Sequence, residues 1–307
     1  MRAAPTFSLI CLAACSSPMA PDAGVDAGRP GCFDVVTGRE ALVCQRWECD
    51  RNNLDEGSWS GSTSACTPGD LSLDSREAAL RLINLYRFLA DLPAVETSAQ
   101  RDAAAQACAL MMHATGRLDH QPDSGFACYT PMGAQAAGNS NLSLTPAIEA
   151  VDRYMQDFGN AQTLGHRRWL LATSLGPVGI GGTPGASCHW VSGGTGNVSR
   201  RFVAWPPAGP VPLAALDFTK VAETGWSVHA FNNADDLAGA RVAVLDDGVD
   251  APVDVTELQA DYGSRWAVSF KPRGWAPKAG HEYVINVTAP AINANPIVYT
   301  VEVVGCP

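Results

Sequence analysis

The ten cysteines of this 307-residue chain constrain its fold more than any other feature. None of them forms a Cys-x-x-Cys pair, and their scattered spacing does not fit a metal-binding ribbon. Disulfides formed in an oxidising compartment are therefore the better interpretation. Because such a compartment lies outside the cytoplasm, this interpretation predicts an export signal near the N-terminus.

The N-terminal residues have the features of such a signal. A short basic start and a short apolar run precede Leu12-Ala13-Ala14-Cys15, which resembles the lipobox of bacterial lipoproteins. We therefore expect residues 1–14 to be a removable lipoprotein signal peptide and Cys15 to carry lipid that anchors the chain to a membrane. Ser16 after the cysteine favours the outer membrane, on its periplasmic or its external face. The alternative is ordinary cleavage after small residues, with Cys15 a simple thiol.

Eight cysteines then remain, which is enough for four disulfides. Residues 15–31 contain almost no large side chains and predict a flexible linker. Residues 32–70 predict a loop-rich lead segment held by disulfides among its own cysteines rather than by a core. Those cysteines are Cys32, Cys44, Cys49 and Cys66. For the other four, the favoured pairs are Cys188 with Cys306 and Cys108 with Cys128.

Two regions with different periodicities follow the lead segment. Within residues 74–207, several segments have apolar residues at helical spacing and capping residues at their ends, which predicts helices. Short apolar runs that predict strands follow them. The helices are expected from residue 74, over 97–116, from 145 to about 159 and over 164–171, and the strands at 178–181 and 188–191. Over residues 215–307, short alternating runs separated by turn residues predict an antiparallel β-sandwich. We therefore expect an α+β chain with these two domains.

The charge of the chain and its missing motifs exclude several function classes. The net charge is −10 at pH 7, so the chain lacks the basic surplus that binding to a phosphate backbone needs. Nucleic acid is therefore not expected as a partner. The sequence contains neither a His-Glu-x-x-His motif nor a Gly-x-Ser-x-Gly nucleophile elbow. These absences favour a non-enzymatic function.

Several short motifs occur in a recognisable order between residues 75 and 205. They are Asn84-Leu85-Tyr86-Arg87, Leu118-Asp119-His120 after an alanine-rich helix, Ala137-Gly138-Asn139, and Gly165-His166-Arg167 before Val178-Gly179-Ile180-Gly181. The ordered set resembles the CAP superfamily of cysteine-rich secretory proteins, antigen 5 and pathogenesis-related proteins. The resemblance implies an α-β-α sandwich with a cleft that holds two histidines and, in many members, two acidic residues. In some members this cleft binds a divalent metal.

Two histidines of this sequence match the cleft histidines of the family, namely His120 and His166. The family's Gly-Glu-Asn segment reads Gly138-Asn139-Ser140 here, so its glutamate is missing, and Glu149 and Asp152 are near only in sequence. Two imidazoles without a carboxylate make an incomplete zinc site and lack an obvious general base. We therefore expect His120, His166 and Asn139 to line a ligand cleft, with at most a weak zinc site at the histidines and no catalytic residue.

Alternatives remain for the residues of this cleft and for the function. Either histidine could have a structural role, and Arg167-Arg168 is expected to be a solvated helix end, with binding of an anionic ligand as the alternative. The first functional hypothesis is a lipid-anchored envelope protein that binds a lipid, a sterol or a protein without catalysis. The second is a metal-dependent hydrolase of peptides or cell-wall material that uses the two histidines. The third is a structural or adhesive surface protein that acts through the β-sandwich.

Overall fold

The computed structural model describes residue 32 and residues 34–307. The expected signal peptide, the lipidated Cys15 and the linker over residues 15–31 lie outside the described residues. Within the described part of the chain, no helix combines the length and the apolar character that crossing a membrane requires.

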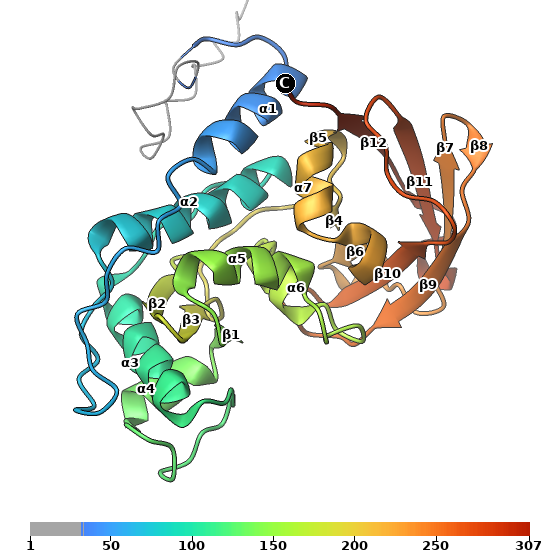
Figure 1. The fold of residues 1–307 in the computed structure, drawn as a ribbon. Helices are drawn as coiled ribbons and strands as arrows, with labels where there is room; N and C mark the ends of the chain where they lie inside the picture. Colours follow the sequence, from blue (N-terminus) through green and yellow to red (C-terminus); the bar gives the residue numbers. More distant parts are fainter. Residues whose placement is uncertain (1–31, 33) are drawn as a thin grey trace, which may run out of the picture.

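The N-terminal half of the described chain is a three-layered α-β-α sandwich (Figure 1). Its middle layer is an antiparallel sheet in the order β1-β3-β2. One face of this sheet is covered by two helices and the other face by two more, so the predicted α-β-α architecture is confirmed. The strands are β1 (Ser140–Ser143), β2 (Gly179–Thr183) and β3 (Ala186–Trp190), and the helices are α3 (Ala99–Thr115) with α4 (Pro131–Ala137) and α2 (Leu73–Leu89) with α5 (Ala147–Gln156).

Glycines in β2 and alanines in α3 explain how closely this helix packs on the sheet. A methyl group at Gly181 would overlap the backbone of Ala105 and its neighbour, so only glycine fits where α3 crosses the strand. Because β2 is an edge strand, its outer amides need partners from the helix. Asp102 Oδ1 accepts from the Ile180 N–H at 2.7 Å, and Gln106 Oε1 accepts from the Gly182 N–H at 3.1 Å.

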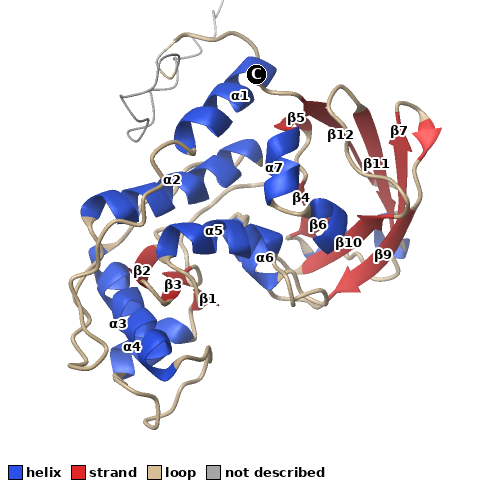
Figure 2. Ribbon diagram, viewed as in Figure 1, coloured by secondary structure: helices blue, strands red, loops and turns tan. Residues whose placement is uncertain are grey.

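The C-terminal half is a β-sandwich, as the alternating runs predicted (Figure 2). One sheet has the order β4-β6-β10-β9 and the other β5-β12-β11-β7-β8, and every pairing is antiparallel except the parallel pair β5–β12. The first sheet consists of β4 (Phe202–Trp205), β6 (Trp226–Ala230), β9 (Val253–Leu258) and β10 (Trp266–Pro272). The second consists of β5 (Gly209–Pro212), β7 (Arg241–Asp246), β8 (Val249–Asp250), β11 (Glu282–Thr288) and β12 (Ile297–Val304). Thus β4 and β5, which precede residue 215, also supply strands to the sandwich.

The helical and the sandwich halves share one apolar interior. A single cluster of buried side chains runs from α2 and α5 into both sheets of the sandwich. At the junction the rings of Tyr86 and Trp205 lie 5.5 Å apart, edge to face. Three short helices lie near this junction: α6 (Gly165–Leu170), α7 (Leu213–Phe218) and α8 (Val221–Thr224). This cluster therefore belongs to both halves, whereas a second, smaller cluster lies between the sheet of the helical half and helices α3 and α4.

The lead segment contains a helix that the sequence analysis did not predict. This helix, α1 (Arg39–Asp50), buries Val43 and Trp47 in the common core, and the C-terminus of the chain lies beside it (Figure 1). The segment is therefore not held by disulfides alone.

All eight described cysteines form disulfides, but most of the predicted pairings were wrong. The bonds are Cys32–Cys49, Cys44–Cys306, Cys66–Cys128 and Cys108–Cys188. The lead-segment cysteines Cys44 and Cys66 bond outside their segment, because α1 lies beside the C-terminus and the loop around Cys66 lies beside that of Cys128. Cys108 bonds to Cys188 rather than Cys128, because α3 packs directly on β3.

Candidate functional site

A cleft of about 260 Å³ opens where the loop after α3, the turn between α4 and β1, helix α6 and the loop between β9 and β10 meet. All three residues predicted to line a cleft, His120, Asn139 and His166, are found in its wall. The remaining lining residues are Gly138, Ser140, Asn141, Asn160, Thr163, Gly165, Trp169, Val191, Ser192, Asp261 and Tyr262. Most of the side chains in this lining are polar.

His120 lies on the exposed loop that follows α3. Its Nδ1 is 2.9 Å from the carbonyl oxygen of Ala137. Because a carbonyl only accepts hydrogen bonds, Nδ1 carries the proton and donates. The neutral ring therefore keeps Nε2 as a hydrogen-bond acceptor.

His166 has an acidic partner that the sequence analysis missed. This partner is Asp157, whose fully buried side chain places Oδ1 2.9 Å from His166 Nδ1. The same oxygen accepts from Asn160 Nδ2 at 2.7 Å, and Oδ2 accepts from the Arg167 N–H at 3.2 Å. The carboxylate thus orients the imidazole and leaves Nε2 of the neutral ring as an acceptor. The only signal in the sequence was an aspartate near the end of the helix predicted from 145 to about 159, which is common in proteins without such a pairing.

The two acidic residues noted near the family motif have structural partners elsewhere. Asp152 accepts two hydrogen bonds from Arg51, at 2.9 and 2.8 Å, and one from the Tyr86 hydroxyl at 2.5 Å. Glu149 forms an exposed ion pair with Arg153 one helical turn later. Neither carboxylate lines the cleft.

Asn139 shapes the cleft wall with both ends of its side chain engaged. Its Nδ2 donates to the Gln135 carbonyl at 2.8 Å, and its Oδ1 accepts from the Ser192 hydroxyl. Its backbone carbonyl also accepts from the Val191 N–H at 2.9 Å. The side chain therefore holds the turn after α4 against the strand end that follows β3.

The prediction that Arg167 and Arg168 form a solvated helix end was wrong, since both are completely buried. Arg167 donates to the carbonyl of Gly225 at 2.7 Å and to the Thr224 hydroxyl at 2.8 Å. Burial lowers the pKa of each guanidinium to about 10, so both stay charged at neutral pH. The two side chains attach α6 to the sandwich. Local sequence patterns could not predict this role, because the hydrogen-bond partners lie far along the chain.

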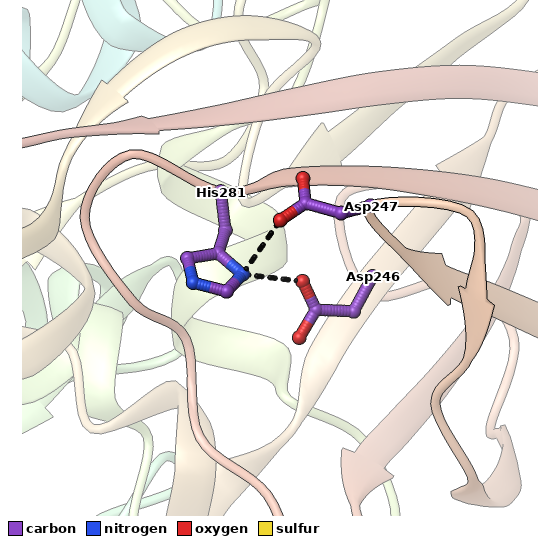
Figure 3. A group of neighbouring side chains, drawn as sticks. All are labelled: Asp246, Asp247 and His281. Atoms are coloured by element: carbon purple, nitrogen blue, oxygen red, sulfur yellow. Dashed lines mark hydrogen bonds and ion pairs between the residues drawn. The ribbon is translucent and has the colours of Figure 1, made fainter.

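The cleft does not have the donor set of a metal site. Among the described residues, one group of three potential ligands lies within reach of a common ion, and it consists of Asp246, Asp247 and His281 (Figure 3). There His281 Nδ1 is 2.7 Å from Asp246 Oδ1 and 3.0 Å from Asp247 Oδ2, so the imidazole lies within hydrogen-bond distance of both carboxylates. His120 and His166 belong to no such group, and a catalytic zinc ion commonly has three protein ligands. The two cleft histidines therefore do not match the ligand set of a catalytic zinc ion.

Comparison with protein families adds one finding. Residues 80–191 match the family model described as CAP: Cysteine-rich secretory protein family. The matched segment includes His120, Asp157 and His166 but ends before Asp261 and Tyr262. No curated protein and no solved structure matches the chain.

Proposed function

Because residues 80–191 form a CAP domain of the cysteine-rich secretory protein family, we propose that this protein binds a ligand without catalysis in the cleft lined by His120 and His166. The CAP domain and the four disulfides indicate an extracellular or cell-envelope protein, since disulfides persist in oxidising compartments. The proposal concerns what the cleft does in that compartment.

The orientation of the two histidines carries the proposal. Each ring donates from Nδ1 to a fixed protein oxygen, which leaves Nε2 of the neutral ring as an acceptor, and both histidines line the cleft. Ligand pockets typically place a few such oriented polar groups in their walls. Because most of the lining residues carry a hydroxyl, amide or imidazole group, a polar ligand fits the cleft better than an acyl chain or a sterol, whose burial would leave these groups without partners.

The proposal is tested with binding assays on small probes of different chemistry. Glucose, N-acetylglucosamine, glycine, choline and palmitate are titrated into the wild-type protein and into His120→Ala and His166→Ala. For the probe that binds, we expect each substitution to weaken affinity about tenfold, the worth of one good hydrogen bond. The control His281→Ala removes a histidine that does not line the cleft and is expected to bind like the wild type. Equal affinity in all four proteins, or no binding of any probe, would contradict the proposal.

One observation favours a hydrolase as the second candidate. The buried Asp157 carboxylate orients His166 in the way that acidic residues orient catalytic or metal-binding imidazoles. Zinc titration separates the candidates. If the two imidazoles do not form a metal site, the wild type should bind zinc as weakly as the double variant His120→Ala/His166→Ala. A tight zinc site that disappears in the double variant would favour the hydrolase.

Anchoring in the outer membrane through lipid on Cys15 completes the proposed function. It is supported by the Leu12-Ala13-Ala14-Cys15 sequence, which resembles a lipobox. Radiolabelled fatty acid should be incorporated into the wild-type protein in bacterial cells and not into Cys15→Ala. Undiminished labelling of the variant would show that the lipobox interpretation is wrong.

A further inference from the structure

The wall of the cleft extends beyond the CAP domain. Asp261 and Tyr262 line it from the loop between β9 and β10 of the sandwich. We propose that the cleft is a composite site for a neutral saccharide, in which Tyr262 supplies an aromatic surface and the two histidines supply hydrogen-bond acceptors. This inference rests on the proposed function of the cleft and adds the class of its ligand.

The loop that carries Tyr262 is held firmly against α6. Arg168 donates to the Gln259 carbonyl at 2.6 Å, to the Ser264 carbonyl at 2.8 Å and to the Ser264 hydroxyl at 2.9 Å. The Gln259 N–H donates to the Gln162 carbonyl at 2.9 Å. Gly263 has a φ of +69° and passes directly over the Arg168 backbone, where a side chain would not fit. The buried arginine thus makes the loop a fixed part of the cleft.

The Tyr262 ring lies over the first residue of α6. A methyl group at Gly165 would lie 2.9 Å from Tyr262 Cδ1, so glycine is needed for the ring to take this position. The Arg168 guanidinium lies 5.7 Å from the ring centroid. Tyr262 nevertheless keeps 37% of its surface exposed, and Trp169 lines the same cleft. Exposed aromatic faces carry negative charge density and attract weakly positive C–H groups, such as those on the faces of sugar rings.

The polar groups available to a ligand are mainly acceptors. They are Nε2 of His120, Nε2 of His166 and the Asp261 carboxylate, whereas the amide donors of Asn139 and Asn160 are engaged by protein oxygens. Ser140 also lines the cleft, is 5% exposed, and its hydroxyl makes no hydrogen bond within the described part of the chain. Buried polar groups without partners are rare in proteins, so this hydroxyl is expected to meet a ligand or water. A ligand rich in hydroxyl groups satisfies such a set.

Charge and size favour a small neutral ligand over the other ligand classes. The buried guanidinium groups of Arg167 and Arg168 are balanced by the carboxylates of Asp157 and Asp261, so the surroundings of the cleft favour a neutral ligand over an ammonium group or a metal ion. An anion would face acceptors and the Asp261 carboxylate instead of donors. The volume of about 260 Å³ is near the lower end of ligand pockets, about 300–1,000 Å³, so a short saccharide unit fits.

The test measures saccharide binding by the full-length protein in which one aromatic ring is changed. Glucose, N-acetylglucosamine and their β-1,4-linked dimers are titrated by calorimetry, with choline and palmitate as the cationic and lipid arms. We expect binding of at least one saccharide, at least tenfold weaker binding by Tyr262→Ala, and binding by Tyr262→Phe within threefold of the wild type. The matched control is Phe158→Ala, which removes an exposed aromatic ring that does not line the cleft and should leave affinity unchanged.

A second variant tests the position of the ring without removing it. Gly165→Ala should displace Tyr262 and weaken saccharide binding at least tenfold. Binding that depends on the histidines but is unchanged in Tyr262→Ala and in Gly165→Ala would overturn the composite wall and leave the proposed function standing. Histidine-dependent binding of choline or palmitate, with no saccharide bound, would overturn the ligand class alone. If no probe binds the wild type, both the inference and the proposed function are overturned.

Discussion

Acid should destabilise this protein through His189, a residue of the central strand β3. The ring is completely buried, and neither nitrogen has a hydrogen-bond partner among the described residues. It packs edge to face against Tyr154, with the ring centroids 5.2 Å apart. Burial lowers the pKa of His189 from 6.5 to about 3, because the charged ring would lose its hydration without gaining a partner.

The sign and size of the effect follow from this shift. Below pH 6.5 the unfolded chain takes up a proton that folded His189 does not, so this contribution to stability is fully present above pH 6.5 and falls as the pH drops towards 3. At pH 5 the unfolded pKa is about 1.5 units above the solution pH, which corresponds to a loss of about 2 kcal/mol relative to pH 8. The substitution His189→Leu fills the site with an apolar side chain that does not bind a proton, so it removes this contribution to the pH dependence.

Urea unfolding followed by tryptophan fluorescence at pH 8 and pH 5 measures this contribution. We expect the wild type to lose about 2 kcal/mol more than His189→Leu between the two pH values. The control Tyr154→Phe removes a hydroxyl that donates to the Asn141 carbonyl, and should lower stability equally at both pH values. If His189→Leu lost as much stability on acidification as the wild type, the burial argument for this histidine would be refuted.

Two further predictions concern long-range contacts. Arg168→Met leaves the Gln259 carbonyl and Ser264 without their buried donor, so we expect the free energy of unfolding to fall by about 3 kcal/mol. Amide hydrogen exchange in the loop between β9 and β10 should become faster, and unchanged exchange there would contradict the anchoring role. The disulfide Cys44–Cys306 joins residues 262 positions apart, and replacing both cysteines by alanine should cost about 6 kcal/mol. The same replacement at Cys32–Cys49, with a separation of 17, should cost about 3 kcal/mol. Chemical denaturation compares the two variants, and a larger loss for Cys32/Cys49 would argue against the chain-entropy explanation.

Patterns of local origin were sufficient for the secondary structure of much of the chain. Helix α3 ends at Gly116, whose φ of +72° is the left-handed conformation that glycine favours at a helix end. Two of the alternating runs between residues 215 and 307 form the strands β9 (Val253–Leu258) and β12 (Ile297–Val304). Such signals are readable because side-chain period and turn chemistry act between residues close in sequence.

The site itself could be predicted only in part. The ordered motifs indicated that His120 and His166 share a cleft, and both line it. Asp157 and Tyr262 were not found, because their roles depend on which segments fold against one another.

By itself, the sequence determined the α+β class and the commitment of eight cysteines to disulfides, and it predicted that two histidines share one cleft. The tertiary structure alone decided the cysteine partners, the burial of Arg167 and Arg168, and the extension of the cleft into the sandwich. The physical reason is that burial and pairing are properties of surfaces brought together from distant parts of the chain. A buried and an exposed arginine have the same local sequence signal, and only the docking of the sandwich on α6 separates them.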